Sequence, residues 1–333
     1  MRDGSMDRGS QSKGGKYRGN TIVRFLSRPS ISRNGVALVI SFAMLMYILC
    51  PPLDGKLRGE TKPWADTVVF VAMGRAAASY SLLYALQSLR DVGRWEGSVH
   101  VVVDDVGKQL IECLPERLTR PLTLVLANTS TEGEGTITQA KLSKTHLLDL
   151  LPQEVRNVLY VDCDVITQRS LEIFWSSLNR TWEKERGKGG SASSIAIFHD
   201  AAGHTVPFCT KCDEAHSGVV ALKRGKSELC LQLWREAFLT SGVATDQEAL
   251  DLVLQGEGGC SAQWLSWRHM RFMKDIFVVA GVTRKRTFAH FTSLLHPARL
   301  SGVHRRHYSR TLGLSYEYEW GTNEGTFQRC AST

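Results

Sequence analysis

Blocks of apolar residues in two different patterns alternate along the middle of this chain. Short runs rich in β-branched and aromatic residues predict buried strands, and they lie at Thr67–Ala72, His100–Val103, Pro121–Ala127, Val158–Ile166, Ser194–His199 and His216–Leu222. Segments with helical spacing separate them, at Ala76–Leu89, Lys144–Leu151, Ser170–Leu178, Lys226–Leu239 and Ala244–Leu254. Strands that alternate with helices favour a parallel sheet covered on both faces. The expected fold class is therefore α/β, with a mixed, mainly parallel sheet flanked by helices.

The run Val158–Ile166, VLYVDCDVI, carries two acidic residues inside an apolar stretch. On an extended backbone, residues two apart point the same way, so we expect Asp162 and Asp164 to present their carboxylates to one place. Ligands of open α/β proteins bind at the carboxyl ends of the strands, and paired carboxylates favour a hard ion such as Mg²⁺ or Mn²⁺. The pattern predicts a site for a metal and a diphosphate. The alternative is that both residues cap a helix or face water.

Most of the positive charge lies at the amino terminus. Residues 1–34 carry eight Lys or Arg and two Asp, out of a formal net charge of +8 for the 333 residues, so the remainder is nearly neutral. We therefore expect no nucleic-acid partner. The same residues are rich in Gly and Ser and poor in apolar groups, which predicts a disordered basic tail.

An apolar segment follows this tail and is closed by Pro51 and Pro52. We predict a transmembrane signal anchor over residues 35–53, with the basic tail in the cytosol; a cleaved signal peptide and a buried helix are the competing interpretations. Residues 54–66 then form a polar stem, 67–300 the catalytic domain and 301–333 a carboxyl-terminal extension. This organisation is that of a single-pass type II protein of the Golgi or endoplasmic reticulum membrane with a lumenal catalytic domain.

Cysteines and glycosylation sequons are compatible with a lumenal domain. The chain has eight cysteines, and an oxidising lumen would permit disulfides among them, with the pairing left open. Asn128 and Asn179 each begin an Asn-X-Ser/Thr sequon, which predicts a glycoprotein.

Four patches across roughly residues 67–300 resemble, in order, the nucleotide-diphospho-sugar glycosyltransferases of the Rossmann-like GT-A fold, most of all glycosyltransferase family 8 and its relatives. They read Asp162-Cys163-Asp164, Ser217-Gly218-Val219, Thr245-Asp246-Gln247 and Phe288-Ala289-His290-Phe291. A fifth match is a basic residue upstream of the acidic pair, placed at Lys144 by its spacing to Leu151-Pro152. One departure is His216, because the family commonly has Asn there.

The resemblance implies a role for each matched residue. Asp162, Asp164 and His290 would bind a divalent metal, Mn²⁺ or Mg²⁺, and Lys144 would face the phosphates or the sugar of the donor. Other donor contacts would come from Asp104, Asp105, His216, Ser217 and Gly218. Asp246 and Gln247 would contact the transferred sugar near its anomeric carbon, and helix capping is the alternative for both. The implied activity moves a sugar from a nucleotide-diphosphate sugar, most simply a UDP-sugar, to a hydroxyl of a glycan, protein or lipid acceptor, with retention.

Two other functions stay open at this point. A haloacid-dehalogenase-type phosphatase would use Asp162 as its nucleophile, although Ile166 stands where that motif normally has Thr. A non-catalytic, membrane-anchored protein that binds sugar nucleotides is suggested by His216. Release of nucleoside diphosphate, release of phosphate, and binding without turnover distinguish the three functions.

Overall fold

The structure is a computed structural model that describes residues 63–74, 77–112, 114–127, 136–186, 194–200, 214–256, 258–272 and 286–291. The predicted tail, the anchor over 35–53, nearly all of the stem and the extension 301–333 lie outside these ranges. Within them, no helix combines the length and the apolar character needed to cross a membrane.

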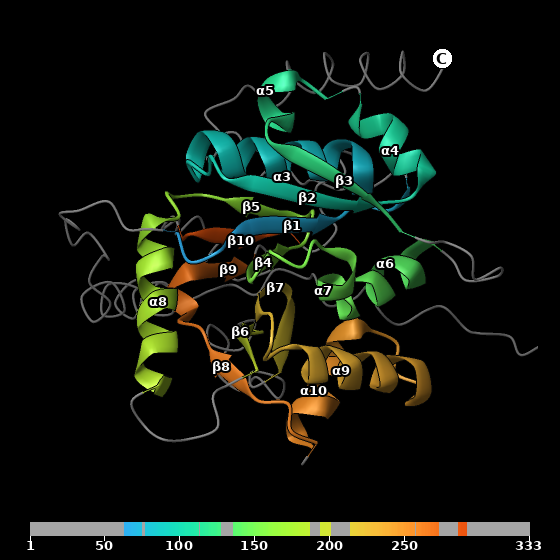
Figure 1. The fold of residues 1–333 in the computed structure, drawn as a ribbon, viewed down its shortest axis with the longest axis vertical. Coiled ribbons are helices and arrows are strands. Elements are labelled where there is room, and N and C mark those ends of the chain that lie inside the picture. Colours follow the sequence, from blue (N-terminus) through green and yellow to red (C-terminus); the bar gives the residue numbers. More distant parts are fainter. Residues whose placement is uncertain are drawn as a thin grey trace, which may run out of the picture. The chain divides into compact units, whose positions relative to one another are not determined.

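The core of the domain is a seven-stranded sheet with the order β3-β2-β1-β4-β7-β6-β8 (Figure 1). All neighbouring pairs are parallel except those that involve β7, which is antiparallel to β4 and to β6. This confirms the expected mixed, mainly parallel sheet. The strands span Thr67–Val71 (β1), Ser98–Val103 (β2), Leu122–Leu126 (β3), Asn157–Val161 (β4), Ile195–His199 (β6), Ala215–Lys223 (β7) and Ala262–Trp264 (β8).

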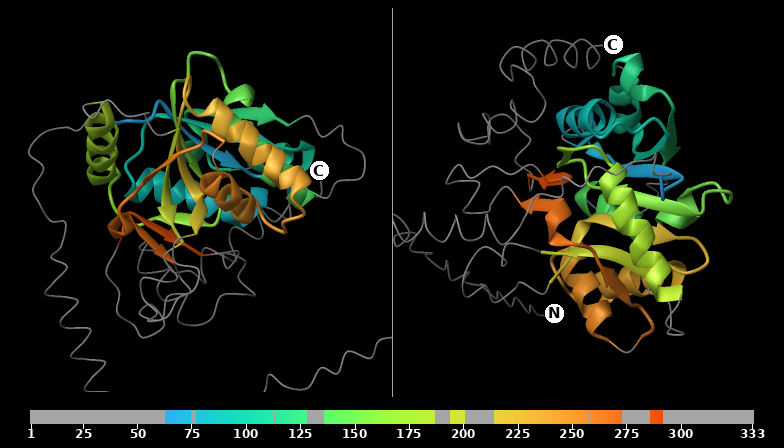
Figure 2. Two further views of the ribbon diagram at one scale, coloured as in Figure 1. Left: turned by 90° about the horizontal axis from the view of Figure 1, so that it is seen from below. Right: turned by 90° about the vertical axis from the view of Figure 1, so that its left-hand side faces the viewer.

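Helices cover both faces of this sheet (Figures 1 and 2). The segment around α3 lies on one face, and α9 and α10 lie on the other. The helical elements are η1 (Ala77–Ser81), α3 (Leu82–Gln87), η2 (Ser88–Val92), α4 (Asp105–Ile111), α5 (Glu116–Thr119), α6 (Thr136–Thr145), α7 (Leu147–Leu150), α8 (Glu172–Arg186), α9 (Glu228–Thr240), α10 (Asp246–Gln255) and η4 (Trp267–His269).

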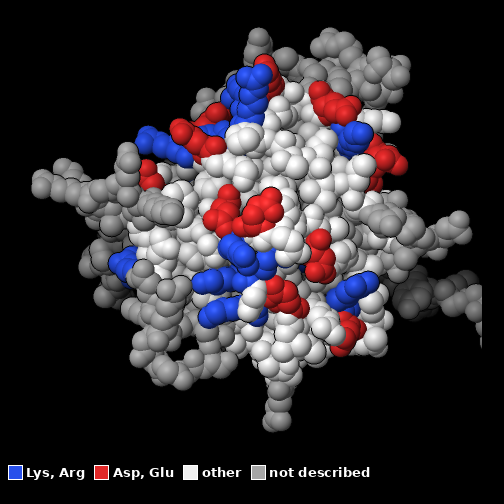
Figure 3. Space-filling view, in the orientation of Figure 1, with Lys and Arg blue, Asp and Glu red and all other residues white. Residues whose placement is uncertain are grey.

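Acidic and basic side chains are interspersed on the described face shown in Figure 3. Near the centre of that view, a group of blue residues lies directly below a group of red ones.

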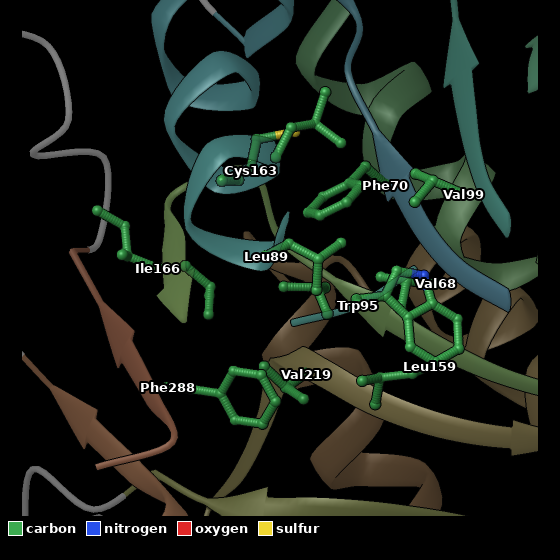
Figure 4. Packing of buried hydrophobic residues seen from close by; sticks show 14 of the residues in the cluster. Val68, Phe70, Leu89, Trp95, Val99, Leu159, Cys163, Ile166, Val219 and Phe288 are labelled. Carbon is green, nitrogen blue, oxygen red and sulfur yellow. The ribbon is translucent and has the colours of Figure 1, made fainter. Parts of the chain in front are cut away.

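Successive residues of β1 pack into two different cores. Val68 and Phe70 belong to the cluster that contains α3, whereas Val69 and Val71 belong to the cluster that contains α9 and α10. Figure 4 shows Phe70 beside Leu89 in the first of these clusters. The alternation follows from the period of two in a strand, and burial on both sides explains why these strands are almost purely apolar.

The antiparallel direction of β7 places two distant segments of the sequence at one edge of the sheet. Val161, the last residue of β4, pairs with Val219 of β7, so the residues that follow β4 lie next to those that precede Val219. In consequence the segment His216–Gly218 comes to lie beside Asp162, although more than fifty positions separate them in the sequence.

A second, three-stranded sheet completes this edge. Its order is β5 (Val165–Thr167), β10 (Phe288–His290) and β9 (Met270–Phe272), with β10 antiparallel to β5 and His290 paired with Val165. The pairing brings His290 next to Asp164.

The predicted continuous strand Val158–Ile166 is wrong in one respect. The chain forms β4, then a turn over residues 162–164, then β5 in the other sheet. The Val165 N–H donates to the Asp162 carbonyl at 3.0 Å, which closes the turn. The two carboxylates therefore converge through a turn and not through the period of two that the sequence suggested.

Two helix boundaries also differ from the prediction. Lys144 lies in the last turn of α6, and only the short helix α7 follows it, so no helix begins at Lys144. The helix expected to end at Leu178 continues as α8 to Arg186, because Trp182 extends its buried face.

Candidate metal and donor site

Three predicted ligands meet at the edge shared by the two sheets. One ligand atom from each of Asp162, Asp164 and His290 lies within 4.8 Å of the others, and His290 Nε2 is 3.2 Å from Asp164 Oδ1. The side chains are 21%, 19% and 12% exposed, respectively. They are therefore accessible to an ion but largely withdrawn from solvent.

Backbone hydrogen bonds fix both acidic residues to neighbouring strands. The Asp162 N–H donates to the Gly218 carbonyl at 2.8 Å, and the Asp164 carbonyl accepts from the Phe291 N–H at 2.9 Å. One acidic residue is thus held by β7 and the other by the end of β10. Such a frame presets the ligand geometry before any ion binds.

Lys144 is the protein's own cation in this site. Its Nζ lies 2.8 Å from Asp162 Oδ1 and 2.9 Å from Asp246 Oδ2, and its side chain is 10% exposed. Burial alone would lower the pKa of Lys144, but the two carboxylates outweigh it and raise the pKa well above the usual value. Lys144 therefore stays charged and joins the metal cluster to the start of α10.

The pKa values of Asp162 and Asp246 shift in opposite directions in this environment. Burial, together with Asp164 and Asp246, raises the pKa of Asp162 despite the opposing Lys144. Burial would also raise the pKa of Asp246, but Lys144 and a hydrogen bond from Ser217 lower it. Of these two carboxylates, Asp162 has the less compensated negative charge, and a divalent cation would compensate it.

At the amino terminus of α10, the residues that cap the helix are different from those that face the site. Thr245 Oγ1 accepts from the Glu248 N–H at 3.1 Å, and Glu248 Oε2 accepts from the Thr245 N–H at 3.1 Å, which is a complete capping box. Asp246 and Gln247 are not the capping side chains, so that alternative is wrong for them. Asp246 binds Lys144, and Gln247 Nε2 donates to Asp200 Oδ2 at 3.0 Å.

Asp200 was not found by reading the sequence. It directly follows β6. Burial lowers the pKa of His290, but Asp164 and Asp162 raise it, and the charge of Asp200 adds to that rise. The signal that could have found it is the rule already applied to Asp162, namely a carboxylate at the carboxyl end of a strand in this kind of sheet.

The segment His216–Gly218 lines the same site. His216 is 1% exposed, and its Nε2 lies 2.9 Å from His290 Nδ1. A Cβ atom on Gly218 would lie 2.6 Å from His216 Cε1 and 2.9 Å from Asp162 Oδ2, so any side chain there would displace one of them. Glycine is needed because protein groups approach its backbone closely.

Asp104 and Asp105 have a different setting. Asp104 accepts from the Gly74 N–H at 2.8 Å and from the Gly107 N–H at 2.7 Å, so one of its oxygens holds the backbone after β1 and the other the start of α4. Asp105 lies in the first turn of α4 and is exposed. Neither belongs to the possible metal-ligand group identified among the described residues, and Asp104 acts as a helix cap.

The ligand set fits the implied ion. The two carboxylates suit the oxygen preference of Mn²⁺ or Mg²⁺, and the imidazole adds one nitrogen ligand. Ligand atoms within 4.8 Å of one another can be bridged by one ion with bonds of about 2.0–2.6 Å. Asp162, Asp164 and His290 would hold this ion.

Comparisons with known proteins give structural neighbours only. No family profile and no curated protein matches the sequence. Several similar solved structures are glycosyltransferases. Mouse xyloside xylosyltransferase 1 is 12% identical, with 68% of this chain and 97% of that one covered and a TM-score of 0.47.

Two further neighbours are similar at the same level. The galactosyltransferase LgtC in complex with donor and acceptor sugar analogues is 15% identical, with 74% and 95% covered and a TM-score of 0.46. The glycosyltransferase GlyE of Streptococcus pneumoniae is 13% identical, with 78% and 64% covered and a TM-score of 0.48. The function of this chain is therefore argued from its own site.

Proposed function

We propose that this protein is a metal-dependent glycosyltransferase that moves a sugar from a nucleotide-diphosphate sugar to an acceptor hydroxyl. The observation that carries the proposal is the meeting of Asp162, Asp164 and His290 at the carboxyl edge of a mainly parallel sheet. Lys144, Asp246 and Gln247 lie directly beside them in one connected set of polar contacts.

The reaction requires a leaving nucleoside diphosphate to carry away growing negative charge. A divalent ion bound at the site would act there as a Lewis acid. Lys144 adds a fixed positive charge, and its ammonium has three donors, of which two already bind Asp162 and Asp246. One donor remains for the phosphates or for the sugar, and the charge is preorganised in a largely buried site.

Asp246 and Gln247 would orient the sugar. Asp246 is 7% exposed and held by Lys144, and Gln247 is tied to Asp200. Side chains that are already fixed lose little conformational freedom when the sugar binds, which favours a near-attack geometry. Neither residue is assigned here as nucleophile or base, and retention of configuration rests on the resemblance of the sequence to family 8.

The cellular setting is part of the same proposal. An anchor over residues 35–53 would place the domain in the lumen of the Golgi or endoplasmic reticulum. The disulfide between Cys230 and Cys260 supports an oxidising compartment, because disulfides seldom persist in the cytosol. The donor would be a UDP-sugar, and the acceptor a glycan, protein or lipid.

Purified protein should release nucleoside diphosphate from one member of a panel of sugar nucleotides when Mn²⁺ is present. A chelator should abolish the release and added Mn²⁺ should restore it. Transfer that persists in excess chelator would exclude the metal from the reaction. Phosphate release from simple esters would instead indicate the phosphatase, and sugar-nucleotide binding without turnover would indicate the non-catalytic binder.

A further inference from the structure

His216 occupies a buried position behind the metal ligands. It lies in β7 and is 1% exposed, and its ring meets that of Phe272 edge to face, with centroids 4.7 Å apart. Its Nε2 is 2.9 Å from Nδ1 of His290. The other nitrogen of His290, Nε2, faces Asp164, so the two ring nitrogens of His290 have separate partners.

We propose that His216 is a positioning residue for the metal site, whose ring nitrogen holds His290 so that His290 Nε2 points at an ion shared with Asp162 and Asp164. This inference rests on the proposed function, since it needs an ion at that site. It gives His216 a role that differs from the donor contact implied by the resemblance.

The hydrogen bond between the rings of His216 and His290 can form both with and without an ion at the site. Without an ion, the Asp164 carboxylate can only accept, so His290 Nε2 carries a proton, and in the neutral ring Nδ1 can accept from His216 Nε2. Were an ion bound at His290 Nε2, the ring proton would lie on Nδ1, which would then donate to His216 Nε2. The pair could therefore keep its geometry in both states, with only the direction of the hydrogen bond reversed.

His216 can change from donor to acceptor in this bond without breaking another hydrogen bond. Its Nδ1 is buried and has no hydrogen-bond partner among the residues that the structure describes. No such contact fixes its tautomer, and the proton can sit on either nitrogen. An outer partner of this kind usually sets the tautomer and the orientation of a ligating histidine.

The His216 ring has close neighbours in Gly218 and Phe272. A Cβ on Gly218 would meet His216 Cε1 at 2.6 Å and Nε2 at 3.0 Å, and Phe272 lies against the ring from another strand. The same glycine carbonyl accepts from the Asp162 N–H. One short stretch of β7 therefore positions two of the three metal ligands, Asp162 through its backbone and His290 through a side chain.

The test compares His216→Gln with His216→Met, which are similar in size but differ in hydrogen bonding. Mn²⁺ is titrated into each protein, alone and with UDP, and the bound ion is measured by calorimetry and electron paramagnetic resonance. His216→Met should bind Mn²⁺ about 10–100-fold more weakly than wild type. His216→Gln should stay close to wild type, because an amide can donate or accept.

Equal Mn²⁺ affinity in the Met variant, or an equal loss in both variants, would overturn the role of His216. Absence of Mn²⁺ binding by the wild type, with and without UDP, would instead overturn the proposed function. His146→Gln is the matched control, because His146 lines a separate pocket of about 290 Å³ with Glu228 and Arg235. Thermal unfolding of each variant confirms that it is folded.

Discussion

At the scale of single residues, Asp162 has the largest number of roles in the site. It accepts from Tyr160 Oη and from Lys144, its backbone is tied to Gly218, and it is one of three possible metal ligands. Its neighbour Asp164 contacts His290 instead. The two acidic residues are therefore not interchangeable, although the sequence presents them as a symmetric pair.

Changing Asp162→Asn or Asp164→Asn should each remove a charged metal ligand with almost no change in shape. We expect transfer to fall by about 100-fold or more, since ligand loss removes several kcal/mol of charge stabilisation. Release of nucleoside diphosphate at saturating Mn²⁺ measures this. Asp91→Asn is the control, because Asp91 forms an exposed pair with Arg117; metal-dependent turnover retained in either site variant would refute the assignment.

Lys144→Met should destabilise the protein, because it leaves Asp162 and Asp246 buried without their cation. Breaking a buried ion pair from one side costs about 3–5 kcal/mol, and denaturant unfolding measures the loss. The double variant Lys144→Met, Asp246→Asn should recover part of that stability, since it removes one of the two unpaired charges. A double variant no more stable than Lys144→Met would show that the pairing with Asp246 contributes little.

Some of these residues were predictable from the sequence and others were not. Asp162, Asp164 and His290 stand in short motifs whose residue types already suggest a metal. The bond between His216 and His290, and that between Gln247 and Asp200, join segments 74 and 47 positions apart, and nothing local marks them. Such contacts depend on the direction of β7 and on which strand lies beside β6, which a single sequence does not display.

At the scale of elements, apolar runs located the strands well, but they did not show where one strand ends and the next sheet begins. Residues 158–166 are apolar on both sides of the acidic pair, so a single strand was the natural prediction. The turn over residues 162–164 sends β5 into the second sheet, where β10 can pair with it. The site exists because of that change of sheet.

The disulfide between Cys230 and Cys260 is the clearest stabilising link between elements. It joins α9 to the segment before β8 across a separation of 30 residues, and both cysteines are buried. Closing a loop of this length restricts the unfolded chain by about 3–4 kcal/mol in the chain-entropy account.

The double variant Cys230→Ala, Cys260→Ala should therefore lose about 3–4 kcal/mol of unfolding free energy. Mn²⁺ affinity should stay unchanged, since neither cysteine belongs to the metal-ligand group. Denaturant unfolding of the double variant, beside wild type with and without reductant, measures the effect. Equal stability of oxidised and reduced wild type would contradict the prediction.

At the scale of the whole molecule, several histidines are kept neutral by the fold. Burial lowers the pKa of His100, of His146 and, most strongly, of His216. In His269, burial together with Arg286, Arg169 and Arg180 lowers the pKa from 6.5 to about 4. His290 differs, because burial lowers its pKa but Asp164, Asp162 and Asp200 together outweigh burial and raise it. For most of these histidines the pKa is therefore higher in the unfolded chain than in the folded protein, so unfolding favours the uptake of protons.

Stability should therefore fall as the pH decreases from about 6.5 towards 4. In this range the unfolded state binds more protons than the folded one, and the free energy of unfolding rises with pH. For His269, which is 3% exposed, the stabilisation is complete above 6.5 and is lost by about pH 4, with a maximum of about 3 kcal/mol. His269→Gln cannot titrate, so its unfolding free energy should change less between pH 6.5 and 4 than that of wild type. Denaturant unfolding at a series of pH values compares the two slopes, and identical slopes would show that His269 is not held neutral by the fold.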